Sequence, residues 1–341
     1  MKPKIVITAA ANNFHFIKDL VPALSDDFDI RMLEWKQSNS FADMKAQVDA
    51  VENADLLWLE WADGANIPLL FSNLELPKII LRLHRYEVFS QRTLNELAKL
   101  TQAEKEKITK LVFVSEKVKE IATMHFPWMC EGVVIPNLID HTRFPLFEKP
   151  KGYNILMLGR MSYVKNLPLA LTMFHELIKL DRNYQLHIVG EISDPELKYY
   201  TANFMEKTDI DRNVYLHGRI PNEQLPEFMK GMHFILSSSI FESFGMGILE
   251  AMSCGLKPVI FDFPGAEYMF PNKWRWTERG KFSRIIMQPE YDPREYHDWV
   301  YFQFSIEKQI HRYKNFIYEA LDSGLTQTEG YMKVLRGTYS K

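Results

Sequence analysis

Short apolar runs alternate with longer amphipathic stretches along most of this chain. In the first half, the apolar runs predict strands at 4–9, 28–33, 55–60, 78–83, 111–114 and 133–135. Between the first two runs, His15 to Leu24 has apolar residues about one turn apart, which predicts a helix. Short buried strands that alternate with helices predict a parallel sheet covered on both faces.

A break interrupts this pattern at 144–153, where prolines, a glycine and several charges predict a linker. The alternation then resumes, and strands are expected at 154–158, 185–189, 214–216, 233–237 and 258–261. From Gln303 to Leu321, apolar side chains follow one stripe, which predicts a long amphipathic C-terminal helix. Such a helix has to bury its apolar stripe on a body that is already folded.

These elements predict an α/β protein with two Rossmann-like, doubly wound domains in series. We place the first domain at 1–147, the second at 148–300, and a final helical segment at 301–341 that packs back on the first domain. Doubly wound sheets bind ligands in a crevice outside the carboxyl ends of their strands. Candidate chemistry is therefore sought in the residues that directly follow each strand.

Composition and charge exclude several classes of protein. Hydrophobic residues make up 46% of the 341 residues and charged residues 25%, which suits a folded protein with two proper cores. The formal net charge of −3 argues against a nucleic-acid-binding protein. Cys130 and Cys254 lie far apart, which indicates neither a disulfide framework nor a metal site and favours a cytoplasmic setting. No apolar run approaches the length of about 18 residues that a membrane span needs.

The segment from Ser237 to Gly255 carries the clearest chemistry. Three serines end a strand, a loop follows that contains Glu242, and a helix then runs to the glycine. Small residues at the start of a helix leave backbone N–H groups open to an anion, and the helix dipole adds to this attraction. We expect a diphosphate to bind there. Glu242 and Glu250 flank this position, and their carboxylates can accept hydrogen bonds from sugar and ribose hydroxyls.

A basic segment follows the first strand of the second domain. Arg160 and Lys165 lie in the run LGRMSYVKN at 158–166, from which both side chains can converge on one anion. They would supply the positive charge that a diphosphate leaving group requires. Neither of these two segments contains an Asp-x-Asp cluster poised to hold a divalent ion, so we expect a site without a metal.

These two segments carry a resemblance to a known family. The run ESFGMGILE at 242–250 resembles the E-x7-E motif of retaining glycosyltransferases of the GT-B fold, in the family 4 (group 1) type. The run at 251–260 and the G-R-x-x-x-x-K-N element at 159–166 are similar to the same family's sequences. The resemblance implies two domains that face a central cleft.

The family implies a role for each matching residue of the second domain. Glu242 would approach the donor sugar, and Glu250 would hold the ribose hydroxyls. Arg160 and Lys165 would bind the donor phosphates. The remaining assignments concern the backbone: the N–H groups of Phe244, Gly245 and Met246 at the distal phosphate, Ile220 at the base, and Gly190 in the nucleotide-binding V-G-x loop.

The acceptor side, in the first domain, departs from the family pattern. His84 ends a strand where many members carry a catalytic-site histidine, but Arg85 follows it in place of the usual aspartate. Glu60 ends another strand and is expected to face the acceptor. The family's glycine-rich loop after the first strand is replaced by small and polar residues, so Asn12 and Asn13 become the candidate acceptor contacts there.

The resemblance implies a retaining glycosyltransferase of class EC 2.4. It would move a sugar from a UDP- or GDP-linked donor to an acceptor hydroxyl, with the nucleotide-sugar as substrate and no cofactor. The acceptor stays open between a glycan, a lipid-linked saccharide and a small molecule, as does the oligomeric state. A covalent enzyme intermediate is left undecided.

The stretch at 99–119 mixes lysines with apolar residues and glutamates, which favours a solvated helix face. Weak peripheral membrane contact is the alternative, and it would place a cytoplasmic protein at a membrane surface.

Two other functions were weighed against transfer. A Rossmann-type oxidoreductase would need G-x-G-x-x-G after the first strand, and residues 9–14 lack it. A non-catalytic protein of the same fold that binds a nucleotide or a sugar stays open.

Overall fold

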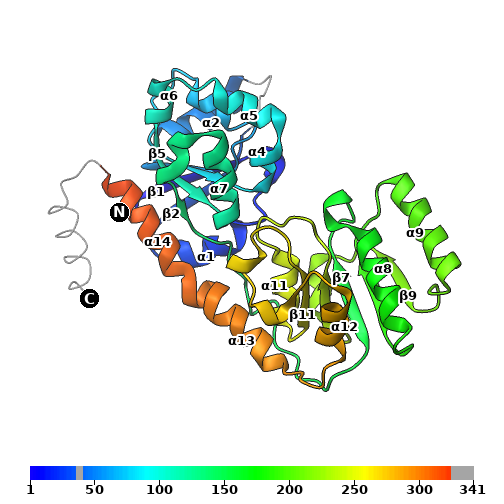
Figure 1. The fold of residues 1–341 in the computed structure, drawn as a ribbon. Coiled ribbons are helices and arrows are strands. Elements are labelled where there is room, and N and C mark those ends of the chain that lie inside the picture. Colours follow the sequence, from blue (N-terminus) through cyan, green and yellow to red (C-terminus); the bar gives the residue numbers. More distant parts are fainter. Residues whose placement is uncertain (36–40, 324–341) are drawn as a thin grey trace. The chain divides into compact units, whose positions relative to one another are not determined.

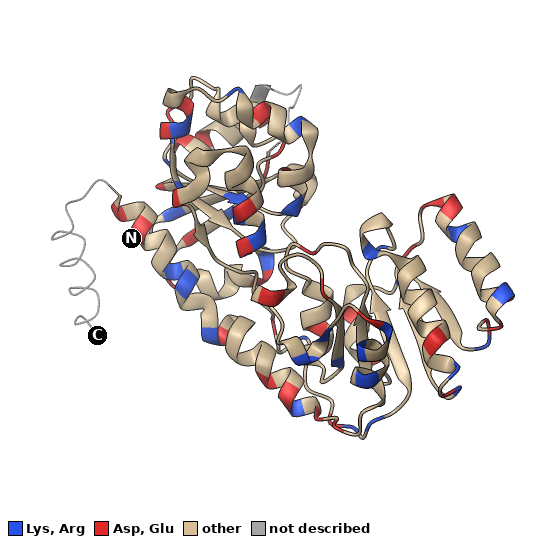
Figure 2. Ribbon diagram, viewed as in Figure 1, with Lys and Arg blue, Asp and Glu red and all other residues tan. Residues whose placement is uncertain are grey.

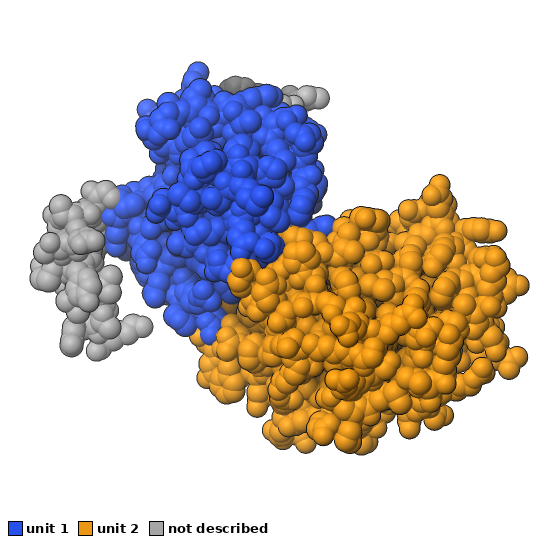
Figure 3. All heavy atoms as spheres, in the orientation of Figure 1, with its two compact units in different colours: residues 1–136, 309–341 blue, residues 137–308 orange. Residues whose placement is uncertain are grey.

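The chain forms two compact units, each built on a six-stranded parallel sheet. The computed structural model describes residues 1–35 and 41–323 (Figure 1). One unit comprises residues 1–136 and 309–341, of which 324–341 lie outside the described part, and the other comprises residues 137–308 (Figure 3). Basic and acidic residues are interspersed along the elements of both units (Figure 2).

The first unit's sheet has the strand order β2-β1-β3-β4-β5-β6, and all neighbours run parallel. Because β2 and β3 lie on opposite sides of β1, the winding direction reverses beside β1. The strands are β1 (Lys4–Ala9), β2 (Asp29–Glu34), β3 (Leu56–Leu59), β4 (Lys78–Leu83), β5 (Ile108–Phe113) and β6 (Val133–Val134).

Helices cover both faces of this sheet. On one face, Leu81 of β4 lies in a buried cluster with Leu97 and Val118 from two helices. On the other face, Trp58 of β3 stacks on Tyr313 of α14 (Ile306–Asp322), with ring centroids 6.1 Å apart. The helices before α14 in this unit are α1 (Val21–Leu24), α2 (Phe41–Glu52), α3 (Ile67–Leu70), α4 (Arg85–Phe89), α5 (Gln91–Ala98), α6 (Gln102–Glu106) and α7 (Glu116–His125).

The second unit's sheet has the order β12-β11-β10-β7-β8-β9, again with parallel neighbours. The winding direction reverses between β7 and β10. The edge strand β12, which is the last strand in the sequence, is short and was not predicted. The strands are β7 (Asn154–Leu158), β8 (Gln185–Val189), β9 (Val214–Gly218), β10 (Phe234–Ser237), β11 (Lys257–Phe261) and β12 (Arg275–Trp276).

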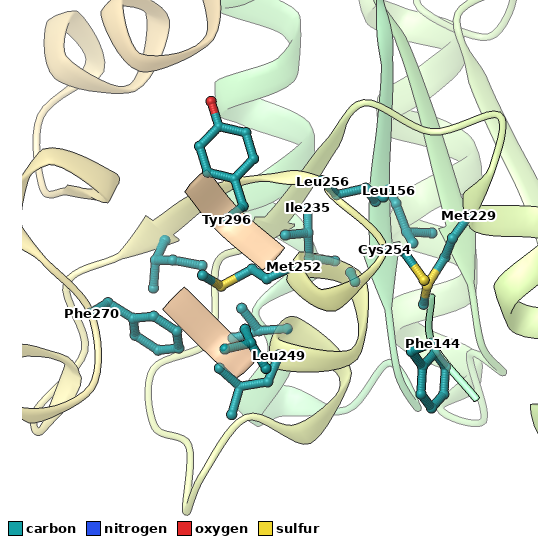
Figure 4. Close-up of a cluster of buried hydrophobic side chains, with 14 of the residues drawn as sticks. Phe144, Leu156, Met229, Ile235, Leu249, Met252, Cys254, Leu256, Phe270 and Tyr296 are labelled. Atoms are coloured by element: carbon teal, nitrogen blue, oxygen red, sulfur yellow. The ribbon is translucent and has the colours of Figure 1, made fainter. Parts of the chain in front are cut away.

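The second sheet is buried on both faces because successive strand residues point to opposite sides. Leu156 and Ile235 lie in one buried cluster, and Ile155 and Phe234 lie in the other. Figure 4 shows the first cluster, in which Met252 of α11 packs beside the strands. The helices are α8 (Leu167–Ile178), α9 (Pro195–Thr208), α10 (Leu225–Met229), α11 (Met246–Ser253), α12 (Arg279–Met287) and α13 (Pro293–Phe304).

The long C-terminal helix predicted at 303–321 is present as α14, but it begins at Ile306 and not at Gln303. Two helices, α13 and α14, meet at Ser305, whose backbone is extended with φ −72° and ψ 147°. Ser305 pairs with Ile139: the N–H of Ile139 donates to the carbonyl of Phe304 at 2.8 Å, and the N–H of Ile306 donates to the carbonyl of Ile139 at 3.1 Å. This local pairing uses backbone groups that a continuous helix would need.

The helix expected at 15–24 is also shorter than predicted. A 3-10 turn spans Lys18–Leu20, and the α-helical part is confined to Val21–Leu24. Pro22 lies at the start of α1, where its missing N–H costs nothing. The apolar spacing was recognised correctly, but the turn of chain after β1 takes up the first residues.

The two units divide at positions that differ from the sequence estimate. The structure separates them at 136/137 and 308/309, whereas the apolar pattern suggested 147/148 and 300/301. Leu138, Ile139 and Phe144 are all buried, and the last two belong to the core of the second unit. Within residues 1–35 and 41–323, no helix combines the length and the apolar character that crossing a bilayer demands.

Candidate functional site

The loops after β7 and β10 border the reversal of winding in the second sheet. From β7 the chain winds outward to β9 on one side, and from β10 it winds outward to β12 on the other. A reversal of this kind opens a crevice outside the carboxyl ends of the strands, where doubly wound sheets bind ligands. The loops at 159–166 and 238–245 therefore occupy the position at which the fold itself predicts a binding site.

Lys165 and Glu242 form an ion pair between these two loops. Nζ of the lysine lies 2.7 Å from Oε1 of the glutamate, and the side chains are 23% and 13% exposed. The hydroxyl of Ser239 donates to the same oxygen at 2.7 Å. Oε2 accepts no hydrogen bond from the described residues. The pair is thus held in place on one side and left open to a ligand on the other.

Hydrogen bonds between the loops fix the position of this pair. Oγ of Ser238, which is fully buried, lies 2.8 Å and 3.1 Å from the carbonyl oxygens of Lys165 and Asn166. The N–H of Ile240 donates to the carbonyl of Val164 at 2.9 Å. Asn166 adopts the left-handed region with φ 49°, a conformation that asparagine tolerates, and α8 begins directly after it.

The loop after β10 ends in Gly245, which starts α11 in a left-handed conformation with φ 72°. The first N–H groups of any α-helix have no acceptor within the helix, and in α11 these include Met246 and Gly247. Gly245 has no side chain that could cap them. The ring of Phe244 is buried edge-on against Phe304, with centroids 5.2 Å apart. Phe244 anchors the loop through its side chain, and its backbone stays at the helix start.

The turns after β7 and β8 approach each other closely enough to exclude side chains. A Cβ atom on Gly190, whose φ is 136°, would lie 1.9 Å from the carbonyl oxygen of Gly159. The N–H of Gly159 donates to the carbonyl of Val189 at 2.9 Å, and the N–H of Gly190 donates to that of Gly218 at 2.7 Å. Gly190 therefore has a packing role at the edge of the candidate site.

The other predicted residues of this unit lie around the same edge without joining the ion pair. Arg160 follows β7, is exposed, and makes no ion pair or hydrogen bond with the described residues. Glu250 is half-buried on α11. Ile220 follows β9 and packs, partly buried, against the core cluster of Figure 4. The structure brings Lys165 and Glu242 together but does not bring Arg160 into contact with Glu242.

His84 lies at the carboxyl end of β4 in the first unit, and its ring is buried among aromatic side chains. It is 2% exposed and stacks on Trp61, with centroids 4.0 Å apart and planes 23° apart. Phe16 stacks on it from 5.0 Å. The indole N–H of Trp61 donates to the carbonyl of Asn13 at 2.8 Å. Three loops of the first sheet's carboxyl edge therefore meet at this histidine.

Glu60, which was expected to face an acceptor, is fully buried in an ion pair. Its Oε1 lies 3.0 Å from Nη1 of Arg82 and 3.4 Å from Nε2 of His84, and its Oε2 accepts the indole N–H of Trp58 at 2.8 Å. Burial alone would raise the pKa of this carboxyl, but Arg82 and His84 outweigh burial and hold the pKa below its ordinary value. Burial lowers the pKa of His84, which favours the neutral imidazole.

The asparagines after β1 are the most exposed of the predicted residues in this unit. Asn12 has φ 53° and donates through its side-chain amide to Glu34 at 3.1 Å. Asn13 is half-buried and contributes its carbonyl to Trp61. The loop keeps the left-handed conformation that glycines would have favoured, at Ala11 and Asn12.

Sequence reasoning missed three residues that hold these sites together. Ser239 bonds to Glu242, and the run of serines at the strand end was a signal that could have identified it. Arg82 pairs with Glu60, and an arginine inside the apolar run KIILRL was a comparable signal. Tyr313 bonds to Arg82 from α14 and had no local signal, because it lies far away in the sequence.

No group of three or more histidine, cysteine, aspartate and glutamate side chains is arranged to hold a metal ion within the described ranges. Cys130 is exposed and Cys254 is buried, and both are free thiols. The chemistry of the candidate site in the second unit therefore rests on an ammonium, a carboxylate, a hydroxyl and backbone N–H groups. This is a donor set suited to an anionic ligand that also carries hydroxyls.

Comparison with known proteins agrees with this donor set. Residues 139–280 match the model of the family described as Glycosyl transferases group 1, and this range includes Lys165, Glu242 and Glu250. A 130-residue segment is 32% identical to the poly(glycerol-phosphate) alpha-glucosyltransferase of Bacillus subtilis (strain 168), over 38% of this chain and 19% of that protein.

A second relative is the GDP-mannose:cellobiosyl-diphosphopolyprenol alpha-mannosyltransferase of Xanthomonas oryzae pv. oryzae, which is 30% identical over 116 residues. The match covers 33% of this chain and 30% of that protein, so the chain matches less than a third of either relative's length. The full-chain structure is similar to that of Anabaena Alr3699/HepE in complex with UDP. The TM-score is 0.72 at 14% identity, and the match covers 93% of this chain and 99% of that one.

Proposed function

We propose that this protein is a retaining glycosyltransferase, because residues 139–280 match the model of the group 1 glycosyl transferases and the chain has the GT-B fold. It moves a sugar from a nucleoside-diphosphate-sugar to an acceptor hydroxyl. The bond from the anomeric carbon to the diphosphate breaks, a bond to the acceptor oxygen forms, and the nucleoside diphosphate and one proton leave. A cytoplasmic location belongs to the proposal and is supported by the two free cysteines.

One observation carries the proposal: the Lys165–Glu242 ion pair at the reversal of winding, beside the glycine start of α11. A positive charge, uncapped N–H groups and a carboxylate at the same reversal of winding are complementary to a diphosphate joined to a sugar. The free Oε2 of Glu242 supports a hydrogen bond from a sugar hydroxyl. A diphosphate that displaces Glu242 from Lys165 would leave both groups paired with the ligand.

The remaining residues receive roles from their places around that pair. Arg160, exposed and without a partner in the described chain, is free to turn toward the diphosphate. The N–H groups from Phe244 to Met246 bind the distal phosphate, and Glu250 binds the ribose. These contacts stabilise negative charge as it develops on the departing diphosphate, which is the largest contribution that such a site makes to catalysis.

The nucleotide base and the acceptor are assigned to the flanking elements. Ile220, after β9, contacts the base through its backbone. Gly190 has no side chain, which leaves space for the nucleotide beside the turn after β8. His84, with Asn12 and Asn13 on the loop after β1, forms the acceptor side of the first unit, and the buried Glu60 contacts His84 without facing the acceptor. No residue assigned here requires a cofactor, and the nucleotide-sugar is a substrate.

A panel of nucleotides and nucleotide-sugars tests the donor part of the proposal. UDP and GDP are the first candidates, because UDP is bound in the HepE structure and GDP-mannose appears in the name of the Xanthomonas relative. One diphosphate at 100 times its Kd should stabilise the protein by about 2.7 kcal/mol, seen as a rise in Tm. Glu242→Gln should reduce sugar transfer while the nucleotide alone still raises Tm.

Glu176→Gln is the matched control, since Glu176 pairs with Lys179 at the same 2.7 Å on the surface of the second unit. It should leave both transfer and the rise in Tm unchanged. A chain that binds a nucleotide but transfers no sugar to glycans, lipid-linked saccharides or small alcohols would be a binding protein, and the transferase proposal would be abandoned. Loss of activity in both variants would remove Glu242 from its role.

A further inference from the structure

We propose that Tyr313, Arg82 and Glu60 form a positioning relay that fixes the orientation of His84 at the carboxyl edge of the first sheet. The relay connects α14, near the end of the described chain, with the histidine at the end of β4. It rests on the proposed function for its effect on turnover. Its effect on the orientation of the imidazole ring can be measured whether or not the protein transfers sugar.

The relay is an unbroken series of contacts between four buried side chains. Nη2 of Arg82 donates to the hydroxyl of Tyr313 at 2.8 Å, and Nη1 of Arg82 lies 3.0 Å and 3.3 Å from the two carboxylate oxygens of Glu60. Oε1 of Glu60 in turn lies 3.4 Å from Nε2 of His84. Tyr313, Arg82 and Glu60 have no exposed surface, and His84 has 2%.

Each partner in this series is held from a separate element. The hydroxyl of Tyr313 donates to the carbonyl of Pro136 at 2.8 Å while it accepts from Arg82, so both of its functions are used. Trp58 donates to Oε2 of Glu60, and its ring stacks on Tyr313. A buried charged pair depends on such hydrogen bonds, because each missing one leaves a polar group buried and unpaired.

Two different restraints act on the histidine ring. Stacking on Trp61 and Phe16 fixes the plane of the ring. A flip of the ring about its Cβ–Cγ bond would keep that plane, and the contact between Nε2 and the carboxylate of Glu60 distinguishes the two flipped positions. Neither ring nitrogen forms a hydrogen bond with the described residues, so the 3.4 Å contact between Nε2 and Glu60 is a charge contact that a small shift would turn into a hydrogen bond. A neutral ring with its proton directed toward Glu60 would present Nδ1 as an acceptor, and the relay selects this arrangement over its alternative.

Arg82 makes the state of Glu60 dependent on Tyr313. Arg82 is the charge that keeps Glu60 ionised despite burial, and the other groups around it are His84, Trp58 and Tyr313. Glu87, on α4 beside His84, accepts the backbone N–H of His84 at 3.1 Å and adds a second acidic group there. Loss of the tyrosine hydroxyl removes one acceptor from the guanidinium, so that Arg82 shifts and Glu60 shifts with it.

Tyr313→Phe tests the relay, because it removes one hydroxyl and keeps the stacked ring. Tyr318→Phe on the same helix is the matched control, since its hydroxyl makes no hydrogen bond with the described residues and its ring contacts Phe28. Long-range proton–nitrogen NMR of histidine-labelled protein reports the tautomer of His84, assigned with a His84→Asn variant. Tyr313→Phe should change the His84 ring signals, and Tyr318→Phe should leave them in place.

Transfer assays add a double-mutant cycle. Tyr313→Phe should lower kcat about tenfold with little change in the KM for the donor. In a His84→Asn background the same substitution should have no further effect, because a residue that acts through His84 loses its influence when His84 is absent. A merely structural tyrosine would lower kcat by the same factor in both backgrounds, and this result would overturn the relay.

The relay and the proposed function fail in distinguishable ways. Unchanged His84 signals in Tyr313→Phe would overturn the relay even if the protein transfers sugar. Absence of transfer in the wild-type protein would overturn the function, while the NMR comparison would still decide the relay. If Tyr313→Phe does not fold, Glu60→Gln keeps the shape of the carboxylate, and it should change the same signals or the relay is excluded.

Discussion

A single ion pair dominates the candidate donor site at the scale of residues. Lys165–Glu242 and Lys179–Glu176 have the same 2.7 Å separation, but their surroundings differ. The first pair joins two loops at the reversal of winding and is mostly shielded, whereas Lys179 is 53% exposed and lies one turn from its partner. An exposed pair on a helix contributes little to stability and faces solvent. The first pair lies at the position where the fold is expected to bind a ligand, so it is the one that we expect to contact a ligand.

Lys165→Met should weaken binding of a nucleoside diphosphate, because it removes the cation that we propose to face the phosphates. We expect a loss of about 1.5–3 kcal/mol, which is typical of a hydrogen bond to a charged group. Isothermal titration with UDP or GDP measures this change. Lys179→Met is the control and should bind as the wild-type protein does; equal losses in both variants would show a general effect of charge.

Glu87 predicts a dependence of stability on pH. Burial raises its pKa to about 8, although its carboxylate accepts backbone N–H groups from Ala62 and His84. The unfolded chain would release this proton near its ordinary value of 4.5 while the folded chain retains it. The unfolded state therefore binds fewer protons between these values, and the free energy of unfolding should fall as pH rises from about 5 to 8.

Urea unfolding at several pH values between 5 and 9 measures this effect. The loss attributable to Glu87 cannot exceed about 1.4 kcal/mol per pH unit. The glutamine of the Glu87→Gln variant cannot ionise. The free energy of unfolding of the wild type should therefore fall relative to that of the variant as pH rises, and the difference should become constant above about pH 8. A constant difference across this range would mean that Glu87 is already ionised at pH 5.

At the scale of elements, the strand ends of the second sheet are shaped by contact between turns. The turns after β7 and β8 lie so close that glycine is required at 190, where the φ of 136° is also unfavourable for other residues. The start of α11 depends on a left-handed glycine in the same way. These backbone requirements explain why the glycines occur in the same short segments as the candidate site residues.

Gly190→Ala should destabilise the protein by about 2–5 kcal/mol, since strain in φ adds to a clash with the carbonyl of Gly159. Gly218→Ala is the matched control: its φ is 65°, and an added Cβ would meet nothing within 4 Å. It should cost only about 1 kcal/mol. Urea unfolding measures the free energy of unfolding of both variants. Similar losses in the two variants would show that backbone strain, and not the clash with Gly159, determines stability at these turns.

At the scale of the whole molecule, the last described helix completes the first unit. Tyr313, Phe316 and Ile317 of α14 are all buried, and Lys314 pairs with Asp27 at 2.6 Å. Trp58 lies against Tyr313 and Phe316. The first sheet therefore depends on residues that are synthesised after the whole second unit.

A chain that ends at Lys308 should lose the cooperative folding of the first unit, because Trp58 and the Arg82–Glu60 pair would become exposed on one face of its sheet. The second unit keeps both faces covered by its own helices, so nucleotide binding should persist. Differential scanning calorimetry with and without nucleotide compares this chain with one that ends at Ser323. Full retention of the first unit's transition would contradict the packing described for α14.

The sequence by itself determined the order and type of most elements, because strand and helix periodicity are local properties of the chain. The strands at 78–83, 154–158 and 185–189 agree with β4, β7 and β8 to the residue. The meeting of Lys165 and Glu242 was predictable for the same reason, since both lie in short motifs on the loops that follow strands. Their role in phosphate binding stays a prediction.

Only the tertiary structure decided how distant segments meet. Glu60 was expected to face an acceptor, but it is buried in an ion pair with Arg82 of the neighbouring strand, and Arg82 is held in turn by Tyr313 of α14. The break at Ser305 depends in the same way on its pairing with Ile139. Such contacts join residues that no local pattern relates, and their energies exist only once the chain has folded around them.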